Sequence, residues 1–243
     1  METGRDRLYD RPGPVAPFAF DAAVAEVFPD MISRSVPGYA AQLELLGILG
    51  ARYLQAHSRL YDLGCSWGAA SRAVLSRSTA PARVIGVDKS AEMIAKATAQ
   101  PVPRSDLVFD WRTGDIADTL LEPCSVILLH YTLQFVPLER RLEVLRRCWE
   151  ALLPGGALLL SEKTRADDPA EDERLEALLA LYKRAHGYTE REIANKRQAL
   201  DAILVPETVA IHRRRLLSAG FPDVTEWFRS LAFVGLLAVK TEG

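Results

Sequence analysis

Length, composition and charge limit what this chain can be. It has 243 residues, which fits one elaborated α/β domain better than two complete domains. Hydrophobic residues make up 49% of it, enough for a sizeable core. The 30 basic and 32 acidic residues give a net charge of -2, which argues against a broad nucleic-acid surface. No apolar stretch approaches the roughly 20 residues of a membrane helix, so no membrane association is expected.

The N-terminal segment and the cysteines favour a cytoplasmic protein. Residues 1–20 contain arginines and prolines but no apolar region of a signal peptide, and they predict a flexible arm. Cys65, Cys124 and Cys148 fall within expected elements and should be reduced and buried. The four histidines lack any metal-ligand spacing, so no metal site is expected.

The order of the expected elements predicts the fold class. Residues 21–53 form a helical lead-in, which Pro29 and Pro37 are expected to break. Strands and helices then alternate, which predicts right-handed crossovers and a mostly parallel sheet with helices on both faces. The strands are expected near 59–63, 83–88, 107–112, 124–130 and 156–162, and the helices near 68–77, 91–99 and 138–152.

Residues 167–200 interrupt this alternation with a helical insertion. A charged helix at 171–185 is followed by Gly187 and by a second helix, which Thr189 and Glu192 open with a capping box. Between the fifth strand and the last helix, such a pair should lie over the ligand edge of the sheet, as a lid or a dimer arm. The insertion has apolar residues on more than one face, namely Leu175, Leu178, Leu179, Leu181 and Tyr182. This predicts a homodimer with the insertion or the lead-in helix at the interface.

The last helix, near 206–218, precedes a final pair of strands near 223–229 and 231–239. One α/β domain is therefore expected over 21–243.

Two helices also carry runs of basic residues. In the helix at 138–152 the leucines and a tryptophan share one face, with Arg140, Arg141, Arg146 and Arg147 largely elsewhere. The run His212-Arg213-Arg214-Arg215 has two interpretations, a phosphate patch or the solvated face of a helix whose Leu216 and Leu217 point inward, and the second is favoured.

The most informative stretch is the loop after the first expected strand. Residues 60–68 read Leu-Tyr-Asp-Leu-Gly-Cys-Ser-Trp-Gly, and an alanine-rich helical segment follows. A strand, a glycine loop and a helix form a backbone cradle for a nucleotide-like ligand. The middle glycine of the dinucleotide fingerprint is absent between Gly64 and Gly68. Asp62, two residues before the first glycine, is instead typical of an S-adenosylmethionine (SAM) loop.

Three further stretches favour a SAM site. An apolar strand ends in Asp88, 24 residues past Gly64, near the distance at which an acidic side chain reaches ribose hydroxyls. Gly114-Asp115-Ile116 follows the third strand, and residues 152–162 read Leu-Leu-Pro-Gly-Gly-Ala-Leu-Leu-Leu-Ser-Glu. A glycine loop alone is equally typical of a helix cap or a tight turn. Four elements in this order favour SAM binding.

With these elements, the chain resembles the carboxy-S-adenosyl-L-methionine synthase family of the class I SAM-dependent methyltransferase superfamily. The resemblance covers the chain from about residue 20 to the end. It implies a Rossmann-like fold with a mostly parallel sheet of about seven strands. The matching stretches are 24–39, 61–66, 114–116, 132–135, 154–157, 161–163, 187–188 and 196–197. The glycine loop indicates only a SAM-binding fold, whereas Phe-Pro-Asp-Met-Ile and Lys-Arg, which lie outside that loop, indicate the narrower family.

The resemblance implies a reaction of SAM with prephenate that gives carboxy-SAM and phenylpyruvate. Carboxy-SAM would then supply a carboxymethyl group for tRNA wobble-uridine modification by a separate enzyme. The sulfonium of SAM would stabilise the methyl carbanion as an ylide. The protein must hold a carboxylate beside that methyl, a role suited to a planar guanidinium. Arg197 matches the family's carboxylate-binding arginine, although by itself it would be interpreted as a surface residue.

The resemblance also implies the cofactor contacts. Asp88 would accept hydrogen bonds from the ribose, and Asp115 with the Ile116 backbone would bind the adenine edge. Tyr39 would pack against or hydrogen-bond SAM. The methionine and ribose part would be lined by Gly64, Cys65 and Ser66.

Two positions depart from the family pattern. His130 replaces an asparagine at the end of the fourth strand, and Lys89 replaces a small polar residue near the adenosine. Both remain expected cofactor contacts. Two alternatives to the synthase stay open: an ordinary SAM-dependent methyltransferase, which would use the same cofactor residues, and a catalytically silent SAM-binding accessory protein, which His130 favours.

Overall fold

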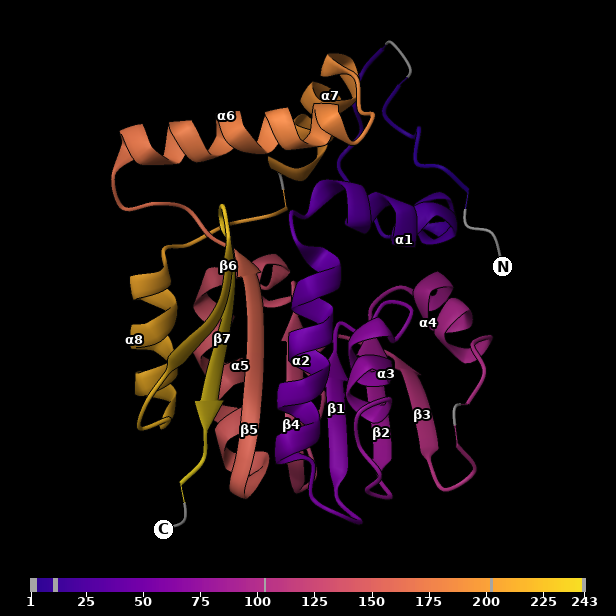
Figure 1. Cartoon of the computed structure of the whole chain (residues 1–243), viewed down its shortest axis with the longest axis vertical. Helices are drawn as coiled ribbons and strands as arrows, with labels where there is room; N and C mark the ends of the chain where they lie inside the picture. The colour runs from indigo at the N-terminus through magenta and orange to yellow at the C-terminus, as the bar shows by residue number, and fades with distance from the viewer. Residues whose placement is uncertain (1–3, 11–12, 103, 202, 242–243) are drawn as a thin grey trace.

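Seven strands form one mixed sheet at the centre of the molecule (Figure 1). This computed structural model describes residues 4–10, 13–102, 104–201 and 203–241. The strand order is β3-β2-β1-β4-β5-β7-β6, and β7 alone runs antiparallel to its neighbours. The strands are β1 (Arg59–Leu63), β2 (Arg83–Asp88), β3 (Val108–Thr113), β4 (Cys124–His130), β5 (Leu152–Lys163), β6 (Thr225–Ser230) and β7 (Phe233–Val239). The predicted Rossmann-like fold is confirmed.

Helices cover both faces of this sheet. The helices α2 and α3 pack on one face and α5 and α8 on the other, while α1, α6 and α7 lie above the carboxyl ends of the central strands (Figure 1). The helices are α1 (Ala22–Ser35), α2 (Tyr39–Tyr53), α3 (Ala69–Leu75), α4 (Ala91–Thr98), α5 (Leu138–Ala151), α6 (Pro169–Ala185), α7 (Glu190–Asp201) and α8 (Val209–Ala219), with a 3₁₀ turn η1 (Leu133–Phe135).

The central strand β4 shows why the sheet is buried on both faces. Val126 and Leu128 pack toward α2 and α3, whereas Ile127 and Leu129 pack toward α5 and α8. Because side chains alternate across a strand, a continuous apolar run supplies two cores at once. This places the carboxyl ends of β1, β2 and β4 side by side under the three upper helices.

The expected break at Pro29 is wrong, because α1 continues through this residue. A proline inside a helix cannot donate to the carbonyl four residues earlier, here that of Ala25. The indole Nε1 of Trp67 donates to the Ala25 carbonyl instead, at 3.1 Å. A residue of the glycine loop therefore replaces the missing hydrogen bond. The predicted break at Pro37 is confirmed, since it lies between α1 and α2.

The expected burial on α5 is also wrong at two positions. Leu138 is 48% exposed, whereas Arg141 is fully buried. The Arg141 guanidinium donates to the Val136 carbonyl at 2.9 Å and forms an ion pair with Glu207 at 2.5 Å. Arg141 therefore ties the start of α5 to the segment before α8, and its charge is compensated within the fold.

The basic run on α8 differs from the expectation in the same way. His212 is buried, and Arg215 forms an ion pair with Glu207 at 2.7 Å. Leu216 points inward as predicted, but Leu217 is 50% exposed. Part of this run is thus internal, and an apolar residue takes a place on the outer face.

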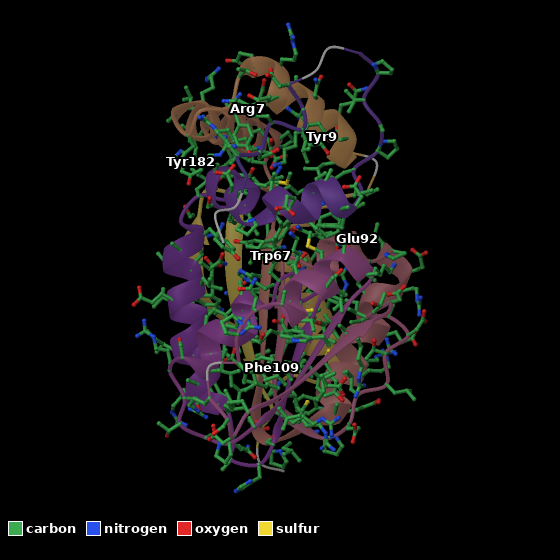
Figure 2. All side chains as sticks on the ribbon, turned by 90° about the vertical axis from the view of Figure 1, so that its right-hand side faces the viewer. Arg7, Tyr9, Trp67, Glu92, Phe109 and Tyr182 are labelled. Atoms are coloured by element: carbon green, nitrogen blue, oxygen red, sulfur yellow. The ribbon has the colours of Figure 1, made fainter. Side chains whose placement is uncertain are left out.

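The N-terminal segment packs more closely than a loose arm would. Asp6 is 1% exposed and accepts a hydrogen bond from the Tyr188 hydroxyl at 2.6 Å. The Tyr9 carbonyl accepts from Asn195 of α7 at 2.9 Å, and Figure 2 shows Tyr9 beside the insertion. Residues 1–3 and 11–12 of the predicted arm lie outside the described residues. The described part lies over the top of the molecule, against α1 and α7.

The second helix of the insertion begins as predicted. The backbone N–H of Thr189 donates to the Glu192 carboxylate at 2.8 Å, and the N–H of Glu192 donates to the Thr189 hydroxyl at 3.2 Å. This reciprocal pair is the predicted capping box. It fixes the start of α7 and therefore the direction in which α7 crosses the sheet edge.

Candidate active site

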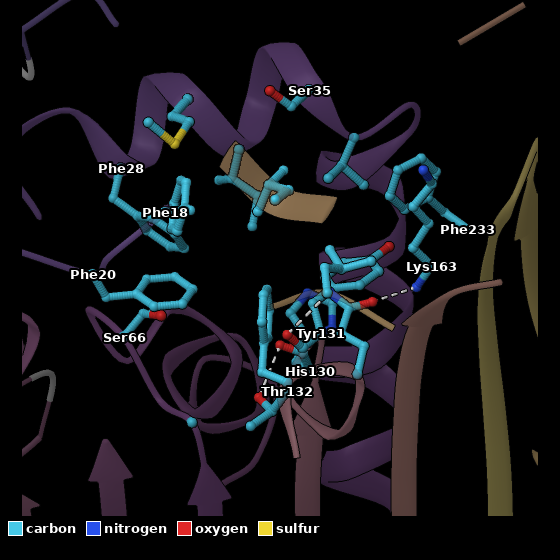
Figure 3. Close-up of a pocket in the computed structure, with 18 of the residues that line it drawn as sticks. Phe18, Phe20, Phe28, Ser35, Ser66, His130, Tyr131, Thr132, Lys163 and Phe233 are labelled. Atoms are coloured by element: carbon cyan, nitrogen blue, oxygen red, sulfur yellow. Dashed lines mark hydrogen bonds between the residues drawn. The ribbon is translucent and has the colours of Figure 1, made fainter. Parts of the chain in front are cut away.

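A cavity of about 530 Å³ lies between the carboxyl ends of the strands and the helices α1, α6 and α7 (Figure 3). Its volume is within the range of small-molecule sites. Arg197 lines it, together with every residue expected to contact the cofactor: Tyr39, Gly64, Cys65, Ser66, Asp88, Lys89, Asp115, Ile116 and His130. The fold thus brings all ten predicted positions to one cavity, although they span more than half of the chain.

The glycine loop is held tightly at the base of the cavity. Gly64 has a φ of 80°, and its N–H donates to the Val87 carbonyl at 2.7 Å. A Cβ on Gly64 would lie 2.2 Å from the Thr132 hydroxyl oxygen, so no other residue fits there. Burial raises the pKa of the Cys65 thiol, which keeps this thiol protonated. The loop is a rigid wall rather than a source of a nucleophile.

Two carboxylates anchor this loop from below. Asp88 accepts from the N–H groups of Ser66 at 2.9 Å and Ser90 at 3.0 Å, and burial raises its pKa. Asp62 is 1% exposed, accepts from the N–H of Ser71 at 3.1 Å, and burial raises its pKa to about 6. Each Asp88 oxygen has a further lone pair, so this residue can still accept from ribose hydroxyls.

The predicted adenine end contains an ion pair. Lys89 Nζ lies 2.9 Å from the Asp115 carboxylate, which also accepts from the N–H of Ala117 at 2.8 Å. Burial alone would raise the pKa of Asp115, but the Ala117 N–H and the Lys89 ammonium outweigh it and lower this pKa. Lys89 therefore compensates Asp115 instead of adding a free positive charge beside the adenosine.

His130 is neutral and has two unused ring nitrogens. Its ring lies between Tyr39 and Tyr131, with centroid distances of 5.7 Å and 4.6 Å. Neither ring nitrogen has a hydrogen-bond partner among the described residues, and burial lowers its pKa to about 3. A neutral imidazole offers one donor and one acceptor, as an asparagine side chain does with its amide. Figure 3 shows His130 and Tyr131 at the cavity floor.

Arg197 reaches the cavity from α7. It is exposed, and no carboxylate of the described residues lies within ion-pair distance of its guanidinium. An unpaired guanidinium on a ligand cavity is suited to bind a carboxylate through two parallel hydrogen bonds.

The aromatic wall of the cavity was not predicted from the sequence. Phe20 makes edge contacts with Phe28 at 6.3 Å and with Phe135 at 5.3 Å, and Phe18 packs on Phe20 at 5.0 Å. Phe18, Phe20 and Phe28 lie on the side of the cavity away from Lys163 (Figure 3). Phe18 and Phe20 belong to the segment expected to be a flexible arm, which gave no signal for this role.

Three lysines that line the upper part of the cavity also had no predicted role: Lys163, Lys183 and Lys196. The spacing on α6 was a usable signal, because residues 172, 176, 179 and 183 fall on one helix face. Among the described residues there is no group of three or more residues with metal-ligating side chains, and no helix is long and apolar enough to cross a membrane.

Solved structures similar to this chain share its fold. Human N-acetylserotonin methyltransferase in complex with SAM aligns with a TM-score of 0.62 at 19% identity, covering 91% of this chain and 56% of that one. An O-methyltransferase family 2 protein from Planctomyces limnophilus aligns with a TM-score of 0.60 at 19% identity, covering 87% and 60%. Residues 60–156 also match the family described as a methyltransferase domain.

Curated relatives are similar over nearly the whole chain. A carboxy-S-adenosyl-L-methionine synthase of Ectopseudomonas mendocina is 45% identical over 98% of this chain and 100% of its own length. One from Pseudomonas fluorescens is 46% identical with the same coverage. With this identity along its full length, the chain belongs to the carboxy-S-adenosyl-L-methionine synthase family.

Proposed function

We propose that this chain is an enzyme that makes carboxy-SAM from SAM and prephenate, with phenylpyruvate as the second product. The strongest support is the unpaired guanidinium of Arg197 on the same cavity as every expected SAM contact. The similarity to synthases over the full chain supports SAM as substrate and carboxy-SAM as product. An ordinary methyltransferase would have no evident use for a carboxylate-binding arginine at this place.

The proposed chemistry balances without an external reagent. The bond between the prephenate ring and its carboxyl carbon breaks, its electron pair makes the ring aromatic, and hydroxide leaves from the opposite ring carbon. Hydroxide takes a proton from the SAM methyl, and the resulting ylide carbon attacks the released CO₂. The products are carboxy-SAM, phenylpyruvate and water.

The protein's part in this reaction is positioning and exclusion of water. Arg197 would hold the carboxylate that leaves as CO₂ beside the methyl group. The aromatic wall of Phe20, Phe28 and Phe135 would keep the ylide and CO₂ away from bulk water. His130, which is neutral, adds no charge beside the sulfonium.

A mass measurement tests this function. The purified chain is incubated with SAM, with and without prephenate, and the nucleotide product is weighed. A product heavier than SAM by one CO₂, formed only with prephenate, is the expected result. S-adenosylhomocysteine would favour an ordinary methyltransferase, and unchanged SAM would favour a silent binding protein.

Arg197→Ala adds the decisive control. We expect this variant to keep nearly all of its SAM affinity and to lose carboxy-SAM formation. Arg197→Lys should restore little, because an ammonium lacks the two-pronged geometry. Wild-type turnover by Arg197→Ala would show that this arginine is an ordinary surface residue.

The setting of the enzyme is part of the same proposal. Carboxy-SAM would supply tRNA wobble-uridine carboxymethylation through a separate enzyme, and the net charge of -2 supports the absence of direct nucleic-acid binding. Three free, buried cysteines support a cytoplasmic location. Exposed Leu178 and Leu181 on α6 support a homodimer.

A further inference from the structure

The upper part of the cavity contains an ion pair between β5 and α6. Lys163 Nζ at the end of β5 lies 2.6 Å from the Glu176 carboxylate of α6. Both side chains are largely buried, at 20% and 28% exposure. Each neutralises the other, so neither is available to pair with a ligand charge without breaking this contact.

Lys196, on the neighbouring helix α7, is also paired. Its Nζ donates to the Ser35 hydroxyl at 2.9 Å and lies 3.5 Å from the Asp6 carboxylate. Its side chain is 7% exposed. Lys196 therefore connects α7 to α1 and to the N-terminal segment.

Lys183 differs from both of these lysines. Within the described part of the chain, its Nζ has no hydrogen bond and no carboxylate within ion-pair distance, although the residue is not exposed. Burial, and then the positive charges of Lys163 and Arg197, lower its pKa to about 8, while Glu176 acts against this. A desolvated ammonium without a partner is costly, and an anion that enters the cavity removes this cost.

Of the cations that line the cavity, Lys183 on α6 and Arg197 on α7 thus have no partner in the described ranges. The two are close enough for the charge of Arg197 to lower the pKa of Lys183. Prephenate carries two carboxylates, one on the ring and one on the pyruvyl side chain. We propose that Lys183 binds the pyruvyl carboxylate, which stays on phenylpyruvate, while Arg197 binds the ring carboxylate, which leaves as CO₂. This assignment rests on the proposed function, and it makes Lys183 a residue that determines the specificity of the site for its carboxyl donor.

The Lys163–Glu176 pair fits this division. Glu176 lies on the same face of α6 as Lys183, one carboxylate between two lysines. Because Glu176 pairs with Lys163, it does not form an ion pair with Lys183, and the Lys183 ammonium stays available to a substrate carboxylate. A donor with one carboxylate would leave one of the two cations unpaired, so the site should favour dianions.

Steady-state kinetics test the proposal with four proteins: wild type, Lys183→Met, Lys183→Arg and Arg184→Met. Arg184 is the matched control, since it is the next residue, is exposed and pairs with Glu190 away from the cavity. Lys183→Met should raise the KM for prephenate by about 10- to 100-fold, the loss of one charge-assisted hydrogen bond. Its affinity for SAM should be unchanged. Lys183→Arg should recover most of the loss, and Arg184→Met should behave as wild type.

Phenylpyruvate separates the two cations, because it carries only the pyruvyl carboxylate. Its binding to the SAM-loaded protein is measured by calorimetry, which needs no turnover. Lys183→Met should weaken this binding by about 10-fold or more, whereas Arg197→Ala should leave it unchanged. The reverse pattern, or equal weakening by both variants, would overturn the assignment. Lys183→Gln, which has a shorter neutral side chain, serves the same test if Lys183→Met does not fold.

The outcomes distinguish this inference from the proposed function. If wild type forms no carboxy-SAM from SAM and prephenate, both are overturned. If wild type is active and Lys183→Met keeps the wild-type KM for prephenate and the wild-type affinity for phenylpyruvate, the assignment of Lys183 alone is wrong.

Discussion

At the scale of single residues, most charges of the site have partners within the protein itself. Asp115 is compensated by Lys89, and Glu176 by Lys163. Asp88 accepts two backbone hydrogen bonds, and His130 is neutral because of burial. Lys183 and Arg197 have no such partner among the described residues, which is why we propose that they bind the substrate.

Asp88 is the residue whose loss should affect SAM most directly. Asp88→Ala should weaken SAM binding by about 1–3 kcal/mol, the usual cost of losing hydrogen bonds to a charged group. The Ser66 N–H would lose its partner as well, so the glycine loop should loosen. Calorimetric titration of the folded variant measures this, with the exposed Asp118→Ala as control. An unchanged affinity would mean that Asp88 does not bind the ribose.

The lowered pKa of Lys183 predicts a pH dependence. As the pH rises through about 8, Lys183 loses its proton and can no longer pair with a carboxylate, so kcat/KM for prephenate should fall. The charged groups that face it are Lys163 of β5, Glu176 of α6, and Lys196 and Arg197 of α7. A pH profile measures this, and Lys183→Arg should move the decline to higher pH.

Lys196 provides the internal control for that profile. Its pKa is also lowered to about 8, chiefly by burial and against the attraction of Asp6. If kcat/KM for prephenate declines at the same pH in wild type and in Lys183→Arg, the titrating group is therefore Lys196 or a group involved in the chemistry of SAM. That result would contradict the role of Lys183.

At the scale of elements, the roof of the cavity is assembled from distant parts of the chain. The described N-terminal segment meets α1 and α7 through Asp6. Its backbone N–H donates to the Asp30 carboxylate of α1, and its own carboxylate accepts from the Tyr188 hydroxyl and pairs with Lys196 of α7. The insertion supplies α6, which brings Lys183 to the cavity, and α7, which brings Lys196 and Arg197. Both helices contact α1: the Tyr182 hydroxyl of α6 donates to the Ser33 carbonyl at 3.4 Å, and Lys196 of α7 donates to the Ser35 hydroxyl at 2.9 Å.

Removal of the Asp6 charge tests this assembly. Asp6→Asn leaves the Lys196 ammonium buried without its carboxylate, which should lower the free energy of unfolding by about 3 kcal/mol. The amide oxygen can still accept from the Tyr188 hydroxyl, so the change isolates the charge. Urea denaturation measures the loss, with exposed Asp10→Asn as control. Equal stability of the two variants would mean that the segment does not hold the roof.

At the scale of the whole molecule, the outer face of the insertion carries exposed leucines that a second subunit could cover. Leu179 of α6 is buried, but Leu178 and Leu181 are 47% and 53% exposed. Adjacent exposed leucines on one helix are more typical of an interface than of a free surface. The proposed homodimer would bury them.

Sedimentation of a double variant tests the dimer. Leu178→Lys with Leu181→Lys should convert a dimer into a monomer, because charges at the centre of an apolar interface are costly. Leu217→Lys on α8, also at an exposed leucine, is the matched control and should stay dimeric. A wild-type protein that sediments as a monomer at every concentration would rule the dimer out.

Local sequence signals determined most of the fold and the base of the site. The alternation of strands and helices predicted the parallel sheet, because period-2 and period-3.6 patterns are readable within each segment. Gly64 predicted the loop, because glycine marks a sharp turn or a close approach of the backbone. The structure agrees: Gly64 has a φ of 80°, and the close Thr132 side chain leaves no room for a Cβ. The ten expected site residues line one cavity, while their individual roles remain predictions.

Only the tertiary structure decided which charged residues are internal. Arg141 was expected off the apolar face of α5, yet it is buried against Glu207, 66 residues away in the sequence. Asp6 was expected in a flexible arm, yet it is buried beside Lys196. Lys183 gave no signal apart from helical spacing. The sequence by itself determined which segments form the sheet and the SAM loop, because those signals are local. The burial of a charge depends on partners that only the folded chain brings near, so the charged roof of the cavity could be known only from the structure.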